Sequence, residues 1–290
     1  MVAGISSQLR PPHGDALALR DWPLPAGQPV RGVVLLVHGL GEHIGRYQEL
    51  ADQLNAWGFA VRGYDQHGHG HSAGARGALP EDDRLLTDLA AVIDDTHRRM
   101  DGRLPLIVLG HSMGGLVAAR GVSLALRRVD ALVLSSPALD VGKGAPLRAL
   151  VRVLARVAPG LRLGNGIDAR RLSHDAAVVQ AYQADPLVHD RISVRLAHFM
   201  FGAGPAVIAC APRWPVPTLL LYAGQDAAVR PAGSAAFARA APPAQVTAQA
   251  FPAHFHEIFN EQDRAPVFSA LHDWLIARFA GVDQAQSAIK

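Results

Sequence analysis

The stretch at residues 104–115 reads Leu104-Pro105-Leu106-Ile107-Val108-Leu109-Gly110-His111-Ser112-Met113-Gly114-Gly115. Its apolar half predicts a buried strand, and residues 113–127 predict a helix. The Gly-x-Ser-x-Gly pattern between them places Ser112 in a tight, strained turn, because glycines two residues before and after leave room for the backbone. Such a turn lifts the serine hydroxyl clear of the chain and points the N–H of Met113 at the oxygen of an attacked carbonyl. The stretch therefore predicts a nucleophilic serine.

Outside this stretch, short apolar runs alternate with amphipathic segments, which is typical of a mostly parallel sheet with helices on both faces. We expect strands at 33–37, 59–64, 104–109, 131–134, 218–222 and 246–251, after a hairpin at about 5–9 and 16–22. We expect helices at about 47–57, 84–100, 113–127, 231–240 and 265–279. The polar tail after Gly281 is expected to be frayed.

The alternation stops between Leu139 and Arg213, where helical patterns are separated by glycine and proline and no convincing strand is found. We expect a helical cap at residues 139–213, inserted into a core domain formed by 1–138 and 214–290. Such a cap would cover the carboxyl ends of the strands, where ligands bind in folds of this kind.

Composition excludes several classes of protein. The 290 residues are 49% apolar and 18% charged, the opposite of a disordered chain, and one cysteine, Cys210, permits neither an intrachain disulfide nor a cysteine-based zinc site. The only lysines are Lys143 and Lys290, so 26 of the 28 basic residues are arginines, but they are dispersed and we expect no nucleic-acid partner. Without a signal-peptide core or a membrane-spanning run, the sequence predicts a cytoplasmic protein.

A nucleophilic serine needs a histidine as base and a carboxylate that orients the histidine. Asp226 follows the strand at 218–222, and His254 and His256 follow the strand at 246–251, which gives the chain order Ser, Asp, His. Asp140, after the strand at 131–134, is an alternative acid. Alternation of residues does not separate His254 from His256.

A second oxyanion donor is expected after the strand at 33–37, where the loop His38-Gly39-Leu40-Gly41 offers the N–H of Leu40. A different pattern, His67-x-His69-x-His71, could suggest a metal site. Alternate residues point the same way only in a strand, and these lie in a turn, so we expect no metal.

Six short motifs of the sequence resemble the serine α/β-hydrolases, specifically the branch of monoacylglycerol lipases and lysophospholipases. They are HGLGEHIGRY at 38–47, YDQHGHGHS at 64–72, GHSMGG at 110–115, YQADPL at 182–187, GQD at 224–226 and HEIFNE at 256–261. The resemblance covers about residues 10–280 and implies the α/β-hydrolase fold. It also implies Ser112, Asp226 and His256 as the catalytic triad, because the family's catalytic histidine is the first residue of the motif HEIFNE. The same resemblance implies Leu40 and Met113 as the oxyanion pair.

We therefore expect a cofactor-free serine esterase that cleaves lipid esters, most of all monoacylglycerol, through an acyl-enzyme on Ser112. The substrate-pocket candidates are His111, Tyr182, Leu147 and Leu150. A lysophospholipase, a broad carboxylesterase or a thioesterase are alternatives, followed by an iminopeptidase-like amide hydrolase or an inactive binding scaffold. Relatives with a carboxylate nucleophile are excluded because a serine stands at the turn.

The expected helix at 147–157 carries an apolar stripe beside arginines at every fourth position. The stripe is Leu147, Leu150, Val151 and Leu154, and the arginines are Arg148, Arg152 and Arg156. One interpretation is that the stripe packs onto the pocket. The other is that the helix lies transiently on a lipid surface with its arginines toward anionic headgroups, which would make the protein peripheral at a membrane.

Overall fold

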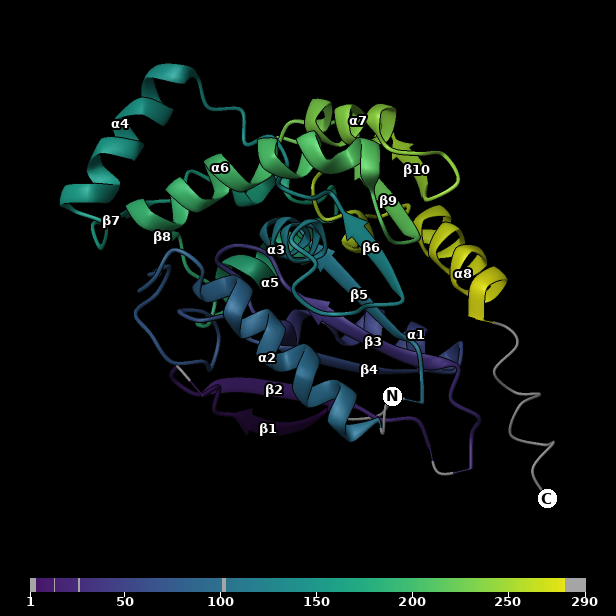
Figure 1. Ribbon diagram of the computed structural model, residues 1–290. Helices are drawn as coiled ribbons and strands as arrows, with labels where there is room; N and C mark the ends of the chain where they lie inside the picture. The colour runs from purple at the N-terminus through teal and green to yellow at the C-terminus, as the bar shows by residue number, and fades with distance from the viewer. Residues whose placement is uncertain (1–3, 13, 26, 101–102, 280–290) are drawn as a thin grey trace.

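The computed structural model describes residues 4–279 except 13, 26, 101 and 102, so the tail after Gly281 lies outside the described residues. Eight strands form one sheet in the order β1-β2-β4-β3-β5-β6-β9-β10 (Figure 1). The strands are β1 (Ile5–Leu9), β2 (Leu17–Trp22), β3 (Gly32–Val37), β4 (Phe59–Tyr64), β5 (Leu106–His111), β6 (Ala131–Ser135), β9 (Thr218–Ala223) and β10 (Val246–Phe251). The hairpin β1–β2 and the pair β2–β4 are antiparallel, and the other pairs in this sheet are parallel.

Helices bury both faces of the sheet. The core on one face contains residues of α2 (Arg84–Arg99), α3 (Met113–Ser123), α6 (Val194–Cys210) and α7 (Pro231–Ala240), and the other core contains residues of α1 (Gln48–Ala56) and α8 (Ala265–Phe279). Strand β3 shows the cause, because Val33, Leu35 and Val37 face the first core while Val34 and Leu36 face the second. This architecture confirms the predicted α/β-hydrolase fold.

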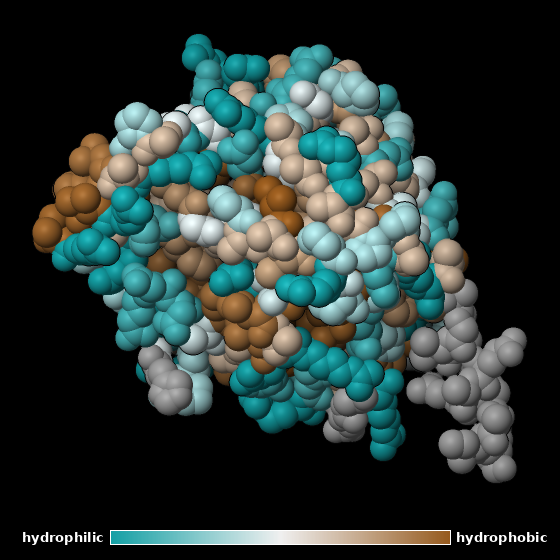
Figure 2. Space-filling view, turned by 45° about the horizontal axis from the view of Figure 1, so that its top comes forward, coloured by the Kyte–Doolittle hydropathy of each residue, from teal (hydrophilic) through white to brown (hydrophobic). Residues whose placement is uncertain are grey.

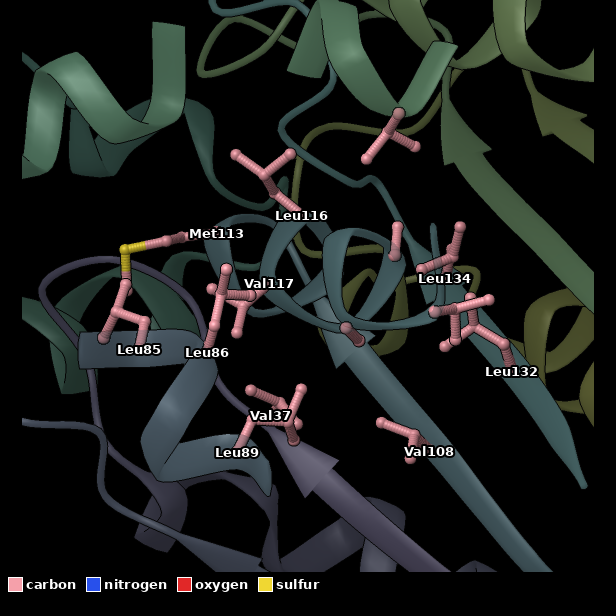
Figure 3. Packing of buried hydrophobic residues seen from close by; sticks show 14 of the residues in the cluster. Val37, Leu85, Leu86, Leu89, Val108, Met113, Leu116, Val117, Leu132 and Leu134 are labelled. Atoms are coloured by element: carbon pink, nitrogen blue, oxygen red, sulfur yellow. The ribbon is translucent and has the colours of Figure 1, made fainter. Parts of the chain in front are cut away.

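The first core includes a contact between α3 and α2. Figure 3 shows Met113 of α3 beside Leu85 of α2 and Val117 beside Leu86, with Leu89 and the strand residue Val37 below them, while Leu116 points to the other side of α3. This packing fixes the start of α3, directly after Ser112, against the sheet.

Most expected bounds agree with the structure to within two residues. Helix α3 is shorter than expected and ends at Ser123, because Ala125 has a φ of 51° and the N–H of Leu126 returns to the carbonyl of Gly121 at 3.1 Å. This is the pattern of a Schellman ending. Strand β5 runs on to His111, which pairs with Ser135 of β6 and brings the sheet directly to the serine turn.

Between β6 and β9 the chain leaves the sheet and forms α4 (Ala145–Val157), η2 (Ala169–Arg171), α5 (Ala176–Ala184), α6 and η3 (Ala211–Arg213). The expectation that this segment holds no strand is wrong. β7 (Arg162–Gly164) and β8 (Arg191–Ser193) pair antiparallel as a separate small sheet. Each has three residues and β7 is fully exposed, so neither carries an apolar alternation that the sequence could reveal. The division of the chain into core and cap domains stays a prediction.

One helical stretch of the described chain, Val194–Arg213, is long and apolar enough by length and composition to cross a membrane. Its side chains Leu196, Met200 and Val207 are nevertheless buried in the first core. The stretch therefore has the character of a core helix of this fold.

Candidate active site

Ser112 lies in the turn between β5 and α3, with an unusual backbone conformation of φ 53° and ψ −118°. Three hydrogen bonds hold this conformation. The N–H of Ser112 donates to the carbonyl of Ser135 at 2.9 Å, and its carbonyl accepts from the N–H groups of Leu116 at 3.0 Å and Ala138 at 2.9 Å. The serine thus stands at the apex of a rigid strand–turn–helix.

The glycines around Ser112 stand where no side chain fits. A Cβ at Gly110 would lie 2.5 Å from the carbonyl oxygen of Gly114, and a Cβ at Gly114 would lie 2.1 Å from the carbonyl oxygen of Val37. At Gly115 the nearest atom would be the carbonyl oxygen of Gly110, at 2.9 Å. Backbone atoms cannot swing aside as flexible side chains can, so only glycines allow β3, β5 and α3 to approach this closely.

His256 and Asp226 come from neighbouring strand ends and form a buried pair. His256 Nδ1 and Asp226 Oδ2 are hydrogen-bonded at 2.6 Å. The other oxygen, Asp226 Oδ1, accepts from the N–H groups of Ala228 at 2.8 Å and Val229 at 2.9 Å, which fixes the carboxylate in place. Because a hydrogen bond from Nδ1 leaves Nε2 free, the histidine can act as a base through Nε2.

The electrostatics of this pair favour a charged histidine. Burial on its own lowers the pKa of His256, but the charge and hydrogen bond of Asp226, with help from Glu257 and Glu42, raise that pKa above its ordinary value. The histidine is therefore suited to accept a proton and hold it as an imidazolium.

The two alternatives left open by the sequence are placed elsewhere. Asp140 Oδ1 accepts from the N–H of Gly142 at 2.9 Å and lies 3.7 Å from Arg148. His254 Nε2 bonds the carbonyl of Asp263 at 2.9 Å. Neither residue takes part in the bond between His256 and Asp226.

The loop after β3 lies directly against Ser112. A Cβ at Gly39 would lie 3.2 Å from the Cβ of Ser112, and the next residue in the loop is Leu40. The N–H groups of Leu40 and Met113 have no hydrogen-bond acceptor among the described residues. Both residues therefore have a free N–H donor, as the predicted oxyanion pair requires.

His111, directly before Ser112, packs against His256. Its ring centre lies 4.7 Å from that of His256, and its Nδ1 bonds Ser135 Oγ at 3.1 Å. Burial and the neighbouring His256 lower the pKa of His111 to about 4, so it is neutral at pH 7. No hydrogen bond joins Ser112 to His256 in this part of the described chain, and in unliganded hydrolases such bonds often form only with substrate.

The remaining pocket candidates divide into two groups. Tyr182 of α5 lies over the guanidinium of Arg46 at 4.7 Å, and burial raises its pKa. Leu147 and Leu150 of α4 are 41% and 52% exposed. Of the apolar stripe on this helix only Val151 is buried, and the structure does not bring the two leucines beside Ser112.

Sequence reasoning assigned no role to an ion-pair network beside the site. Arg46 bonds Glu42 Oε2 at 2.6 Å and both oxygens of Glu257 at 2.8 Å. All three residues lie in motifs shared with the family. The four-residue spacing of Glu42 and Arg46 is the feature of the sequence that could have predicted an ion pair. Among the described residues, no three His, Cys, Asp or Glu side chains are arranged to hold a metal ion.

Comparison with known proteins places these observations in a family. Residues 28–263 match the model of the Hydrolase_4 family, described as serine aminopeptidase, S33. The chain is 36% identical over 257 residues to a monoacylglycerol lipase of Mycolicibacterium smegmatis, covering 85% of this chain and 89% of that protein. It is 31% identical over 255 residues to Phospholipase YtpA of Bacillus subtilis, covering 86% of this chain and 96% of that protein.

Solved structures give the same result. The crystal structure of a Paleococcus ferrophilus monoacylglycerol lipase superposes with a TM-score of 0.81 at 34% identity, covering 90% of this chain and 98% of that one. The likeness therefore extends over nearly the whole of both chains.

Proposed function

Since the chain belongs to the Hydrolase_4 family of α/β-hydrolases, described as serine aminopeptidase, S33, we propose that it is a serine hydrolase of carboxylic esters that acts on monoacylglycerols. The observation that carries the proposal is the buried pair of His256 and Asp226, whose imidazole lies 4.7 Å from the ring of His111, the residue before Ser112. The free N–H groups of Leu40 and Met113 support it, because acyl transfer needs a stabilised oxyanion as well as a nucleophile.

The reaction follows from these positions. His256 Nε2 takes the proton of Ser112 as the serine oxygen attacks the ester carbonyl, and the N–H groups of Leu40 and Met113 hold the resulting oxyanion. The imidazolium, stabilised by Asp226, gives its proton to the departing alcohol, and the acyl group stays on Ser112. Water then enters, loses a proton to His256 and releases the fatty acid.

A lipid ester is favoured over a peptide by the charges around the site. An aminopeptidase binds the substrate ammonium with a free carboxylate. Of the carboxylates beside the site, Glu42 and Glu257 are both paired with Arg46, and Asp226 is bonded to His256. The names of the relatives, monoacylglycerol lipase and phospholipase, support an ester of a fatty acid.

A substrate panel tests this proposal. Hydrolysis rates are measured for monoacylglycerols, triacylglycerols, lysophospholipids, short esters, acyl thioesters and aminoacyl amides, with the Ser112→Ala variant as blank. We expect the highest kcat/KM for monoacylglycerols and no turnover by the variant. A preference for aminoacyl amides over esters would overturn the substrate assignment.

We further propose that α4 contacts the lipid surface from which the substrate is drawn. Leu147, Leu150, Val153 and Val157 are between 41% and 73% exposed on this helix. Figure 2 shows an apolar patch at the left edge of the molecule, where α4 and β7 lie in Figure 1. Exposed apolar side chains next to arginines suit the interface of an anionic bilayer.

Vesicle flotation tests this contact. The wild type should float with vesicles containing anionic lipid, and Leu150→Asp should lose most of this binding because a carboxylate replaces an inserted side chain. The matched control is Leu124→Asp, which changes a leucine that is 43% exposed just beyond the end of α3. Equal flotation of the two variants would count against the contact.

A further inference from the structure

Arg46 joins two loops that carry different parts of the proposed catalytic machinery. Its side chain is 11% exposed and lies between the carboxylates of Glu42 and Glu257, which are each 5% exposed. Both nitrogens of its guanidinium fork bond Glu257, and Nη1 also bonds Glu42. This geometry uses the planar shape of arginine, which a lysine cannot reproduce.

Glu42 connects Arg46 to the proposed oxyanion loop, the segment 38–41 after β3 that carries the N–H of Leu40. Its Oε1 accepts the N–H of Gly39 at 2.6 Å, directly before Leu40, and the hydroxyl of Tyr47 donates to the same oxygen at 2.7 Å. Burial would raise the pKa of Glu42, but Arg46 and its other neighbours outweigh burial and lower that pKa to about 2. The carboxylate therefore stays charged, and holds Gly39, throughout the pH range in which an esterase works.

Glu257 connects Arg46 to the proposed catalytic base. It follows His256 in the chain, and its backbone N–H donates to the carbonyl of Leu172 at 2.8 Å. Its Oε2 also accepts from the side-chain amide of Asn260 at 2.7 Å. A shift of the Glu257 carboxylate would thus move the loop that presents the imidazole.

We propose that Arg46 is a positioning residue for ester hydrolysis, which ties the loop carrying the Leu40 donor to the loop carrying His256. This inference rests on the proposed function. The two loops follow β3 and β10. These strands lie far apart in the strand order, so no strand pairing in the sheet joins the loops. Errors in catalytic geometry of about 1 Å can lower a rate on the order of 100-fold, so a tie of this kind matters for the reaction.

The tie also affects the protonation of the base. The charged and titratable groups around His256 are Asp226 after β9, His111 at the end of β5, Glu42 directly after the proposed oxyanion loop, Glu257 beside His256 and Arg46 in η1 (Ile44–Tyr47). Glu42 and Glu257 both raise the pKa of His256. Removing the positive charge of Arg46 leaves these carboxylates uncompensated, so that pKa should rise further.

Two variants test the proposal on the purified full chain, with fluorophosphonate titration counting the active sites. In Arg46→Lys, which keeps the charge and loses the fork, we expect kcat per active site to fall about 10- to 100-fold while KM stays nearly constant. Inhibition by an alkylboronic acid, which fills an oxyanion hole as a tetrahedral adduct, should weaken in parallel. In Arg46→Met, where the pKa of His256 should rise, the low-pH side (acid limb) of the plot of kcat/KM against pH should move to higher pH.

Arg62 provides the matched control, because it is also a buried arginine between two carboxylates. Its side chain is 4% exposed and lies 2.6 Å from Asp95 and 3.4 Å from Asp21. Arg62→Lys and Arg62→Met should lower the melting temperature but leave kcat per active site, boronate inhibition and the acid limb unchanged. Wild-type kcat and boronate affinity in Arg46→Lys, or an equal loss in Arg62→Lys, would overturn the proposal. A wild type without ester hydrolysis would instead refute the proposed function, and this inference with it.

Discussion

At the scale of single residues, Ser112 has a strained backbone conformation, with a φ of 53°. A positive φ in a residue other than glycine stores on the order of 1–3 kcal/mol, which the surrounding hydrogen bonds must offset. The bonds to Ser135, Leu116 and Ala138 do so. His256, in contrast, is held by its bond to Asp226, so the position and the charge of this proposed base depend on one carboxylate.

This dependence predicts the behaviour of Asp226→Asn. A neutral base is required, so kcat/KM of the wild type should rise with pH through the raised pKa of His256, above its ordinary 6.5. Without the carboxylate charge that pKa falls, and the acid limb should move to lower pH while kcat drops on the order of 10³- to 10⁴-fold. The measurement is a pH profile of p-nitrophenyl ester hydrolysis by both proteins. An acid limb at the same pH in the variant would show that Asp226 does not set the protonation of the base.

At the scale of elements, the junction of β3, β5 and α3 decides whether the serine turn can form. Gly114 of α3 lies directly against the end of β3, since a Cβ there would also lie 2.4 Å from the carbonyl oxygen of His38. We expect Gly114→Ala to lower the free energy of unfolding by about 3 kcal/mol, because two backbone segments must separate.

Gly121 is the matched control for this change, since it lies in the same helix. A Cβ there would meet the flexible side chain of Leu89 at 3.2 Å and no backbone. Gly121→Ala should therefore change the free energy of unfolding by less than about 1 kcal/mol, helped by the helical preference of alanine. Urea titration of both variants checks the pair, and equal midpoints would refute the steric account.

The elements also show what a sequence can predict. Strands such as β3 were predictable because both faces are buried and an unbroken apolar run results. The elbow was predictable because its glycine spacing follows from local sterics. Alternation of residues did not separate His256 from His254, and only the family resemblance favoured His256. The hydrogen bond that distinguishes it in the structure is to Asp226, 30 residues away, and lies outside any local pattern. The sequence left open whether Leu147 and Leu150 pack onto the pocket or lie exposed for a lipid surface, because a helix's partner is set by tertiary packing; both leucines are exposed in the structure.

At the scale of the whole molecule, several buried or half-buried histidines couple stability to pH. Burial lowers the pKa of His38, His69, His111 and His189 from the ordinary 6.5, to about 4 for the last two. Below pH 6.5 the unfolded chain therefore binds protons that the folded chain does not. The stabilisation is complete above pH 6.5 and is lost as the pH falls toward 4.

We accordingly predict that the free energy of unfolding decreases between pH 7 and pH 5, with each fully buried histidine contributing at most about 1.4 kcal/mol per pH unit. Urea unfolding at both pH values measures the slope. The slope should be smaller in His69→Gln, whose ring is fully buried, and unchanged in His272→Gln, whose side chain is 41% exposed. A wild type equally stable at pH 7 and pH 5 would contradict this account.

The proposed reaction depends on a single activated serine that carries the acyl group. The most direct test treats the protein with a fluorophosphonate, maps the adduct by mass spectrometry and follows monoacylglycerol hydrolysis in the same samples. We predict one phosphonate per chain, on Ser112, with activity lost in proportion to labelling and neither labelling nor activity in Ser112→Ala. A fully labelled protein that keeps its activity, or an active Ser112→Ala variant, would contradict the account.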